Sequence, residues 1–107
     1  MTDVVLMLTT VPSAELAETV AHALVTGRLA ACVNVLPPMT SIYRWNDAVE
    51  RAAEQQLVIK TTESQVPHVE ALLRELHTYD LPELLVIGAK GGAAAYLAWI
   101  HDATSIV

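Results

Sequence analysis

The sequence predicts an α+β domain in which one antiparallel sheet carries two helices on a single face. Three observations predict it. Apolar segments typical of strands alternate with segments of helical periodicity, Gly and Pro separate them, and 107 residues suffice for one domain (1–107) but not for two. The expected order is the ferredoxin-like βαββαβ plan, followed by an added C-terminal helix and a short terminal strand.

The first half of the chain supplies a strand, a helix and two more strands. Residues 4–11, VVLMLTTV, are β-branched and aliphatic, which indicates a strand buried on both faces. Pro12 and Ser13 then begin a helix, and Gly27 suits its C-terminal cap. ACVNVL and TSIYRW are typical of strands, and Pro37-Pro38 separates them. The period of two places three side chains of the second strand on one face: Ser41, Tyr43 and Trp45.

The second half continues the alternation. NDA is turn-like, and residues 54–61, EQQLVIKT, predict a strand that forms a long hairpin with the preceding one. Thr62 and Gln65 resemble a capping box, and an apolar stripe between 66 and 76 indicates the second helix. LLVIGA predicts the next strand, Gly91-Gly92 precedes the helix AAAYLAWIH, and the final SIV is the expected terminal strand.

The bulk composition excludes some classes of protein. The chain is 53% apolar with a mean hydropathy of +0.41, so we expect its surplus apolar surface to pack in a homo-oligomer. A net charge of −6 with six Lys and Arg residues excludes nucleic-acid binding. The single Cys32 fits a reducing compartment, and neither a signal peptide nor a membrane span is indicated. We therefore expect a soluble, cytoplasmic protein with no membrane partner.

No short motif announces a metal centre, because CxxC, HxH and HExxH are all absent from the sequence. Cys32 is a soft ligand, but a cysteine on a strand is more often a small buried apolar residue. His68 and His77 are nine residues apart and fall on opposite sides of a helix, so they do not chelate as a pair. Any metal site must therefore be assembled by folding or by subunit contact.

The stretch HTYDLPELLVI, residues 77–87, allows two interpretations. In the first, His77 ends a helix and Pro82 breaks it before the next strand. In the second, His77, Tyr79 and Glu83 meet Lys60 in a polar pocket. Both interpretations stay open at the level of sequence. Four aromatic residues are expected to pack in the core or at an interface, with ligand stacking as the minority alternative: Tyr43, Trp45, Tyr96 and Trp99.

Four stretches taken together resemble the CutA family of divalent-cation tolerance proteins: RLAACVNVLPPMTSIYRW, EQQLVIKT, HTYDLPELL and YLAWI. The resemblance covers nearly the whole chain in the same order. It implies a ferredoxin-like subunit in a tight homotrimer, related in architecture to the PII signalling proteins. It also implies a role in tolerance of divalent metals, copper in particular, with metal binding but no catalytic mechanism.

The matching positions are those at which the chain carries the residue typical of the family: Cys32, Ser41, Tyr43, Trp45, Glu50, Glu54, Lys60, Thr61, His77, Tyr79, Pro82, Glu83, Tyr96 and Trp99. The chain departs from the family pattern at four places, where Gly is replaced by Asp47, Pro by Thr78 and Gly88, and Asn-Pro-Asp by residues 93–95. The missing carboxylate at 95 puts in doubt any pocket that needs it beside Tyr96. We also expect the turn at Asp47 to differ, because Gly permits positive φ more cheaply.

Two main hypotheses follow from the resemblance. In the first, a homotrimer binds divalent metal ions, with divalent copper as the candidate cofactor, through three expected ligands: Cys32, His77 and Glu83. In the second, a PII-like module binds a small organic ligand in clefts between subunits, lined by Tyr43, Trp45, Lys60, Tyr79, Tyr96 and Trp99. A structural trimer that only presents surfaces to a partner is also compatible with the sequence. An enzyme is not expected, because no nucleophile or cofactor motif accompanies His77 and Glu83.

Overall fold

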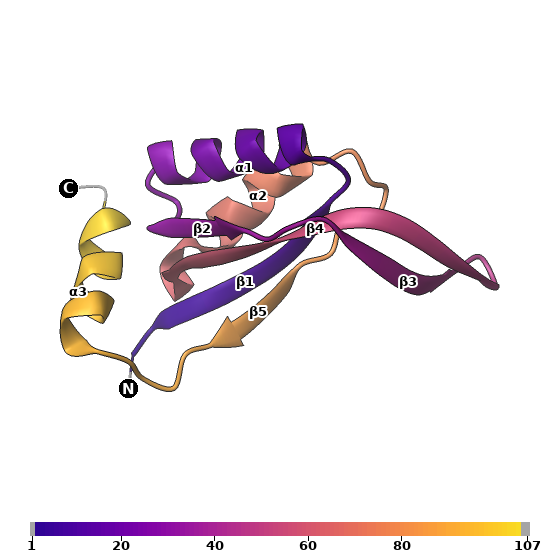
Figure 1. Ribbon diagram of the computed structural model, residues 1–107. Helices are drawn as coiled ribbons and strands as arrows, with labels where there is room; N and C mark the ends of the chain where they lie inside the picture. Colours follow the sequence, from indigo (N-terminus) through magenta and orange to yellow (C-terminus); the bar gives the residue numbers. More distant parts are fainter. Residues whose placement is uncertain (1, 106–107) are drawn as a thin grey trace.

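The computed structural model describes residues 2–105 and confirms the predicted α+β fold (Figure 1). The terminal strand predicted for SIV falls on residues 106–107, outside the described residues, and on Ser105, which is in no strand. The elements in chain order are β1 (Val4–Val11), α1 (Ala14–Thr26), β2 (Cys32–Val35), β3 (Met39–Trp45), β4 (Ala48–Thr62), the 3-10 helix η1 (Glu63–Gln65), α2 (Val66–Leu76), β5 (Leu85–Gly88) and α3 (Ala94–Ala103).

The sheet is antiparallel throughout, in the order β2–β4–β1–β5, and β4 is its longest strand with 15 residues. Residues 57–60 of β4 pair with β2, and residues 48–54 pair with β3. Val35 lies opposite Leu57 and Met39 opposite Glu54, so the three residues 36–38 on one side are matched by two, 55 and 56, on the other. The predicted break at Pro37-Pro38 is therefore a bulge that divides one paired edge into two strands.

The hydrophobic core lies between the sheet and the two helices α1 and α2, which cover the same face. Met7 of β1 and Leu57 of β4 are fully buried, and they belong to one cluster with Leu24 of α1 and Val69 of α2. These side chains alternate along the strands and recur at helical spacing on the helices, as the sequence predicts. Burial of this face fixes which side of every strand looks outward.

The ends of α1 are capped by local hydrogen bonds. The Ser13 hydroxyl accepts from the Leu16 amide at 3.1 Å, which confirms the predicted N-cap. Gly27 is the C-cap, but its φ is −79°, and Arg28 takes the positive φ of 60° that usually selects glycine. A Cβ at position 27 would lie 3.1 Å from the Ala23 carbonyl oxygen, so Gly27 is needed for close approach.

The capping box predicted for α2 is wrong. The Thr62 side chain makes no capping hydrogen bond, because Glu63–Gln65 form a 3-10 turn between it and the helix. The Gln65 amide instead donates to the Thr104 carbonyl oxygen at 3.1 Å and so ties α2 to the end of α3. Gln65 therefore makes a long-range hydrogen bond to Thr104 instead of the capping hydrogen bond that its spacing from Thr62 indicated.

The β3–β4 hairpin extends beyond the helices and ends in a two-residue turn (Figure 1). Asn46 and Asp47 both adopt positive φ, at 49° and 64°. Two such residues in succession define the turn that matches the twist of a hairpin. Asp47 thus takes the left-handed conformation that Gly adopts more cheaply and that Asp tolerates at a modest cost.

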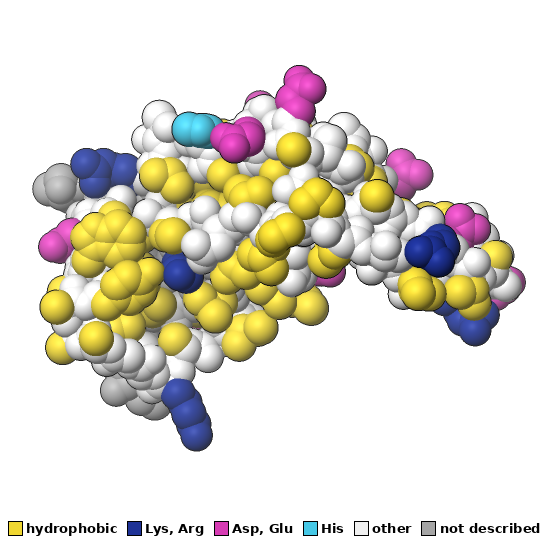
Figure 2. Space-filling view, in the orientation of Figure 1, with side chains coloured by type: hydrophobic (Ala, Val, Ile, Leu, Met, Phe, Trp, Pro, Cys, Tyr) yellow, Lys and Arg dark blue, Asp and Glu magenta, His cyan; other side chains and the backbone are white. Residues whose placement is uncertain are grey.

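The other face of the sheet has no helix over most of its area. Leu6 lies opposite Ile87, and Leu8 lies opposite both Val58 and Leu85, so the strands present adjacent apolar side chains there. Hydrophobic side chains gather over these strands in Figure 2. We call this surface the open face. No helix within residues 2–105 is long and apolar enough to cross a membrane.

Candidate functional site

A cleft of about 1180 Å³ opens between the β3–β4 hairpin and the segment 78–85 that leads into β5. We call it the hairpin cleft. Its walls combine aromatic, acidic and apolar side chains from the hairpin, the end of β1 and the facing segment: Thr10, Pro12, Ser41, Ile42, Tyr43, Trp45, Ala52, Ala53, Glu54 and residues 78–85. The lining includes four of the residues that the sequence proposed for a site: Tyr43, Trp45, Tyr79 and Glu83.

A buried carboxylate lies in the wall of the hairpin cleft. Glu54 is only 9% exposed, and its Oε2 accepts a hydrogen bond of 2.7 Å from the Tyr79 hydroxyl. Burial acts to raise the pKa of Glu54, but the hydroxyls of Ser41, Tyr79 and Thr10, with a smaller contribution from nearby His77, stabilise the carboxylate and leave its pKa below the usual value. Burial and the Glu54 charge raise the pKa of Tyr79. The pair is therefore a neutral phenol donating to an ionised carboxylate at neutral pH.

The contacts of His77 distinguish the two interpretations of the stretch HTYDLPELLVI. Its Nε2 lies 2.6 Å from the Thr10 carbonyl oxygen, and its Nδ1 accepts from the Tyr79 amide at 3.1 Å. Both ring nitrogens of His77 are therefore engaged in hydrogen bonds within the chain. Its ring also lies 4.6 Å from the Tyr79 ring. His77 thus ends α2, as in the first interpretation, and holds Tyr79 near Glu54; of the second interpretation, only the proximity of His77 and Tyr79 is found.

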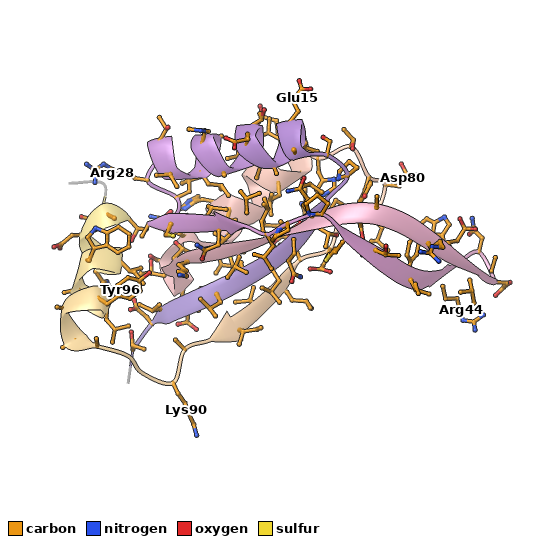
Figure 3. The ribbon with its side chains drawn as sticks, in the orientation of Figure 1. Glu15, Arg28, Arg44, Asp80, Lys90 and Tyr96 are labelled. Carbon is orange, nitrogen blue, oxygen red and sulfur yellow. The ribbon has the colours of Figure 1, made fainter. Side chains whose placement is uncertain are left out.

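A second polar and aromatic group lies at the other end of the sheet, under α3. The Lys60 amino group lies 3.4 Å from the Tyr96 hydroxyl and 5.8 Å from the centre of its ring. The Tyr96 and Trp99 rings are 5.5 Å apart, and Cys32 lies opposite Lys60 in the sheet. Figure 3 shows Tyr96 between α3 and the strands. We call these four residues the α3 cluster.

The predicted cleft residues thus divide between two places in one chain. Tyr43, Trp45 and Tyr79 line the hairpin cleft, while the remaining members form the α3 cluster: Lys60, Tyr96 and Trp99. Glu83 does not meet Lys60, because its Oε2 accepts from the Gln56 amide at 3.4 Å. The single polar pocket around Lys60 that the sequence suggested is not formed by these hydrogen bonds.

Cys32 lies apart from the other two predicted metal ligands, His77 and Glu83. Cys32 is opposite Lys60, whereas His77 bonds Thr10, which is opposite Gln56. Four residues along β4 separate those positions by roughly 13 Å. No three His, Cys, Asp or Glu side chains within residues 2–105 gather as a metal centre would require. The ligand assignment to Cys32, His77 and Glu83 stays a prediction that needs donors from more than one chain.

The sequence matched Glu54 to the family pattern but gave it no role. Its only signal was a carboxylate at the start of a segment that otherwise alternates as a buried strand. Thr10 and Ser41, whose hydroxyls stabilise it, come from β1 and β3. Residues that meet only through the pairing of three strands leave no spacing pattern along the chain.

The fold and the cleft define a small α+β protein with a βαββαβ core, a projecting hairpin and an added C-terminal helix. The model of the CutA1 divalent ion tolerance protein family matches residues 5–103. The divalent-cation tolerance protein CutA of Thermus thermophilus is 44% identical over 104 residues, which cover 97% of this chain and 99% of that protein. The chain therefore belongs to the CutA1 divalent ion tolerance protein family.

Solved structures support the same assignment. The divalent cation tolerance protein Cut A1 from Thermus thermophilus superposes with a TM-score of 0.93 at 42% identity, over 95% of this chain and 99% of that one. CutA from Xylella fastidiosa superposes with a TM-score of 0.93 at 40% identity, over 96% and 99% of the two chains. The resemblance stated from the sequence is thus confirmed across the whole fold.

Proposed function

We propose that the protein acts as a homotrimer in tolerance of divalent cations, copper among them, and that it binds the ion weakly without catalysing a reaction. The observation that carries this proposal is the family match over residues 5–103, whose description is divalent ion tolerance. A cytoplasmic location fits the proposal, since a reducing compartment keeps Cys32 as the free thiol that the structure has.

The open face supports the homotrimer. Leu85 is 56% exposed and Ile87 is 47% exposed on β5, which has no paired strand on its outer side in the part of the chain that the structure describes. Apolar side chains continue from this edge across β1 to Val58 of β4. Exposed apolar surface of this extent beside a free strand edge favours burial against further copies of the chain.

The distribution of donor atoms supports weak binding. His77 has both ring nitrogens engaged within its own chain, so coordination would cost it the hydrogen bond to Thr10 or to Tyr79. Cys32 is half-buried beside the open face, and its thiolate is the softest donor available to copper. Packing of several copies across the open face would bring the Cys32 sulfur atoms of different chains together, whereas a single chain offers isolated ligands only.

Sedimentation tests the homotrimer. We expect the wild-type mass to be three times 11.6 kDa at micromolar concentration. Ile87→Asp places a charge on the open face and should dissociate the assembly. Val25→Asp is the matched control, because Val25 is similarly exposed at 43% but belongs to α1, on the opposite side of the sheet. A folded wild-type monomer, or equal dissociation by both variants, contradicts the proposed assembly.

Calorimetric titration with Cu²⁺ tests the metal ligands. We expect Cys32→Ala to weaken binding and Glu83→Gln to have a smaller effect, with His22→Ala as a control on the exposed face of α1. Copper bound equally by wild type and Cys32→Ala, or by neither, excludes Cys32 as the ligand. Zn²⁺ titrated in the same way separates a preference for copper from general cation binding.

A further inference from the structure

We propose that the hairpin cleft binds a small organic cation, an alkyl- or arylammonium ion, with the Glu54 carboxylate as counter-ion and the rings of Tyr43 and Trp45 as walls. This inference goes beyond divalent-cation tolerance, and its counter-ion, Glu54, is not one of the proposed metal ligands; Glu83, which is one of them, contributes only to the negative charge of the lining. It also gives a chemical class to the small ligand that clefts of this fold were expected to take.

The charge of the cleft has one sign. Glu54, Asp80 and Glu83 are among the lining residues, and no Lys, Arg or His is. Glu54 is about nine-tenths buried, yet it forms no ion pair within residues 2–105, and the nearby His77 ring is hydrogen-bonded to Thr10 and Tyr79 instead. Hydroxyl groups alone hold this carboxylate by hydrogen bonds, and a cation in the cleft supplies the positive partner that a buried charge favours.

Glu54 also has hydrogen-bonding capacity to spare. A carboxylate accepts about four hydrogen bonds, and the hydroxyls of Tyr79, Ser41 and Thr10 supply three of them. The carboxylate belongs to the face of β4 that it shares with Gln56 and Lys60, away from the helix-covered core. An ammonium N–H entering the cleft therefore meets an ionised acceptor that is already fixed in place by Tyr79.

Size and lining distinguish an organic cation from a metal ion. A volume of about 1180 Å³ is far larger than a bare ion needs and matches the clefts that hold small organic molecules. Tyr43 and Trp45 are 41% and 42% exposed on β3, so their rings have area free for a ligand cation. Pro12 and Leu81 provide apolar surface for its alkyl or aryl part. A hydrated metal ion would leave these walls unused.

A second copy of the chain is the competing occupant. Arg44 lies near the tip of the hairpin and points away from the body of the molecule in Figure 3, and Arg51 lies opposite Ile42 on the same hairpin. A guanidinium from a neighbouring copy would satisfy the same carboxylate. The organic cation is favoured because the aromatic and apolar walls exceed what one Arg side chain covers, and the experiment below separates the two.

The test compares three probes of similar shape by calorimetry or by NMR titration: 2-phenylethylammonium, the neutral 2-phenylethanol and the anionic 3-phenylpropanoate. We expect the ammonium to bind on the order of tenfold tighter than the alcohol, and the anion to bind more weakly than either. Glu54→Gln should remove the preference for the ammonium, and Trp45→Ala should weaken both the ammonium and the alcohol. Glu63→Gln removes an equal charge from an exposed position at the far end of β4 and should change nothing.

The outcomes are separable. Equal affinity for ammonium and alcohol, or an unchanged preference in Glu54→Gln, overturns the role of the carboxylate. Because Glu54→Gln also removes a buried charge, its fold is checked by circular dichroism, and the exposed Trp45→Ala gives an independent result. If no probe binds while Arg44→Ala lowers the assembly mass, a second copy fills the cleft and the proposal is wrong. A copper-binding trimer that binds no ammonium refutes this inference alone, and a monomer that binds it refutes only the proposed assembly.

Discussion

Replacing Tyr79 with Phe should destabilise the protein through one hydrogen bond. The substitution removes the hydroxyl that donates to Glu54 Oε2 at 2.7 Å and leaves the ring beside His77 unchanged in size. A hydrogen bond to a charged group contributes about 1.5–3 kcal/mol. Glu54 is 9% exposed, so water does not readily replace the lost donor, and we expect a loss within that range at pH 7.

The pH dependence of this loss follows from the pKa shifts of the pair. The pKa of Glu54 is below its usual value in the folded state, so its contribution is complete above the unfolded-state pKa of about 4.3 and disappears as pH falls through the folded pKa. The pKa of Tyr79 is raised, so the neutral phenol stabilises the fold below about pH 10 and the effect is lost as pH rises through the folded pKa. The cost of Tyr79→Phe should therefore be largest between those limits.

Urea unfolding followed by circular dichroism measures the effect, at one fixed protomer concentration because an oligomer's stability depends on it. Tyr43→Phe is the control, since no hydrogen bond of the Tyr43 hydroxyl is found within residues 2–105 and its side chain is 41% exposed. Its change should stay within about 0.5 kcal/mol. A Tyr79→Phe loss that small, or one that is equal at pH 7 and pH 3, would refute the assignment of an ionised Glu54.

Three further substitutions test other parts of the fold. Thr9→Val should raise the free energy of unfolding by about 1 kcal/mol, because the Thr9 hydroxyl is fully buried and has no hydrogen-bond partner within residues 2–105; unchanged urea midpoints would contradict this. Asp47→Gly should add about 1 kcal/mol at the positive φ of 64°, measured by thermal unfolding, and a loss would mean that the turn has another conformation. Gln65→Ala should speed amide exchange in α3 by removing the hydrogen bond to the Thr104 carbonyl oxygen, and unchanged exchange would mean that α3 is held elsewhere.

The element order could be predicted because each segment carries a local pattern. The apolar run at 4–11, the N-cap Ser13 and the proline break at 37–38 each act on their own neighbours, and the structure has them where the sequence places them. The capping role of Gln65 could not be judged locally. Its amide bonds a carbonyl oxygen 39 residues away, and that contact competes successfully with the cap.

The candidate site was less accessible to sequence reasoning. Tyr43, Trp45 and Tyr79 are predicted together and do line one cleft, because alternation along β3 and the break at Pro82 are local signals. Lys60 is expected beside them, but the pairing of β2, β4 and β1 carries it to the other end of the sheet. Distances across a sheet depend on register, which no spacing along one strand reveals.

β4 is the strand with which β1, β2 and β3 all pair, so their register depends on it. One residue inserted between 55 and 57 would shift the register of Leu57 and Ile59 against β1 and β2 and would turn both side chains out of the core. The bulge at 37–38 already absorbs an unmatched residue, so changes of chain length should be accommodated there and at the hairpin turn. The length of the β3–β4 hairpin can thus change while the register of the rest of the sheet is kept.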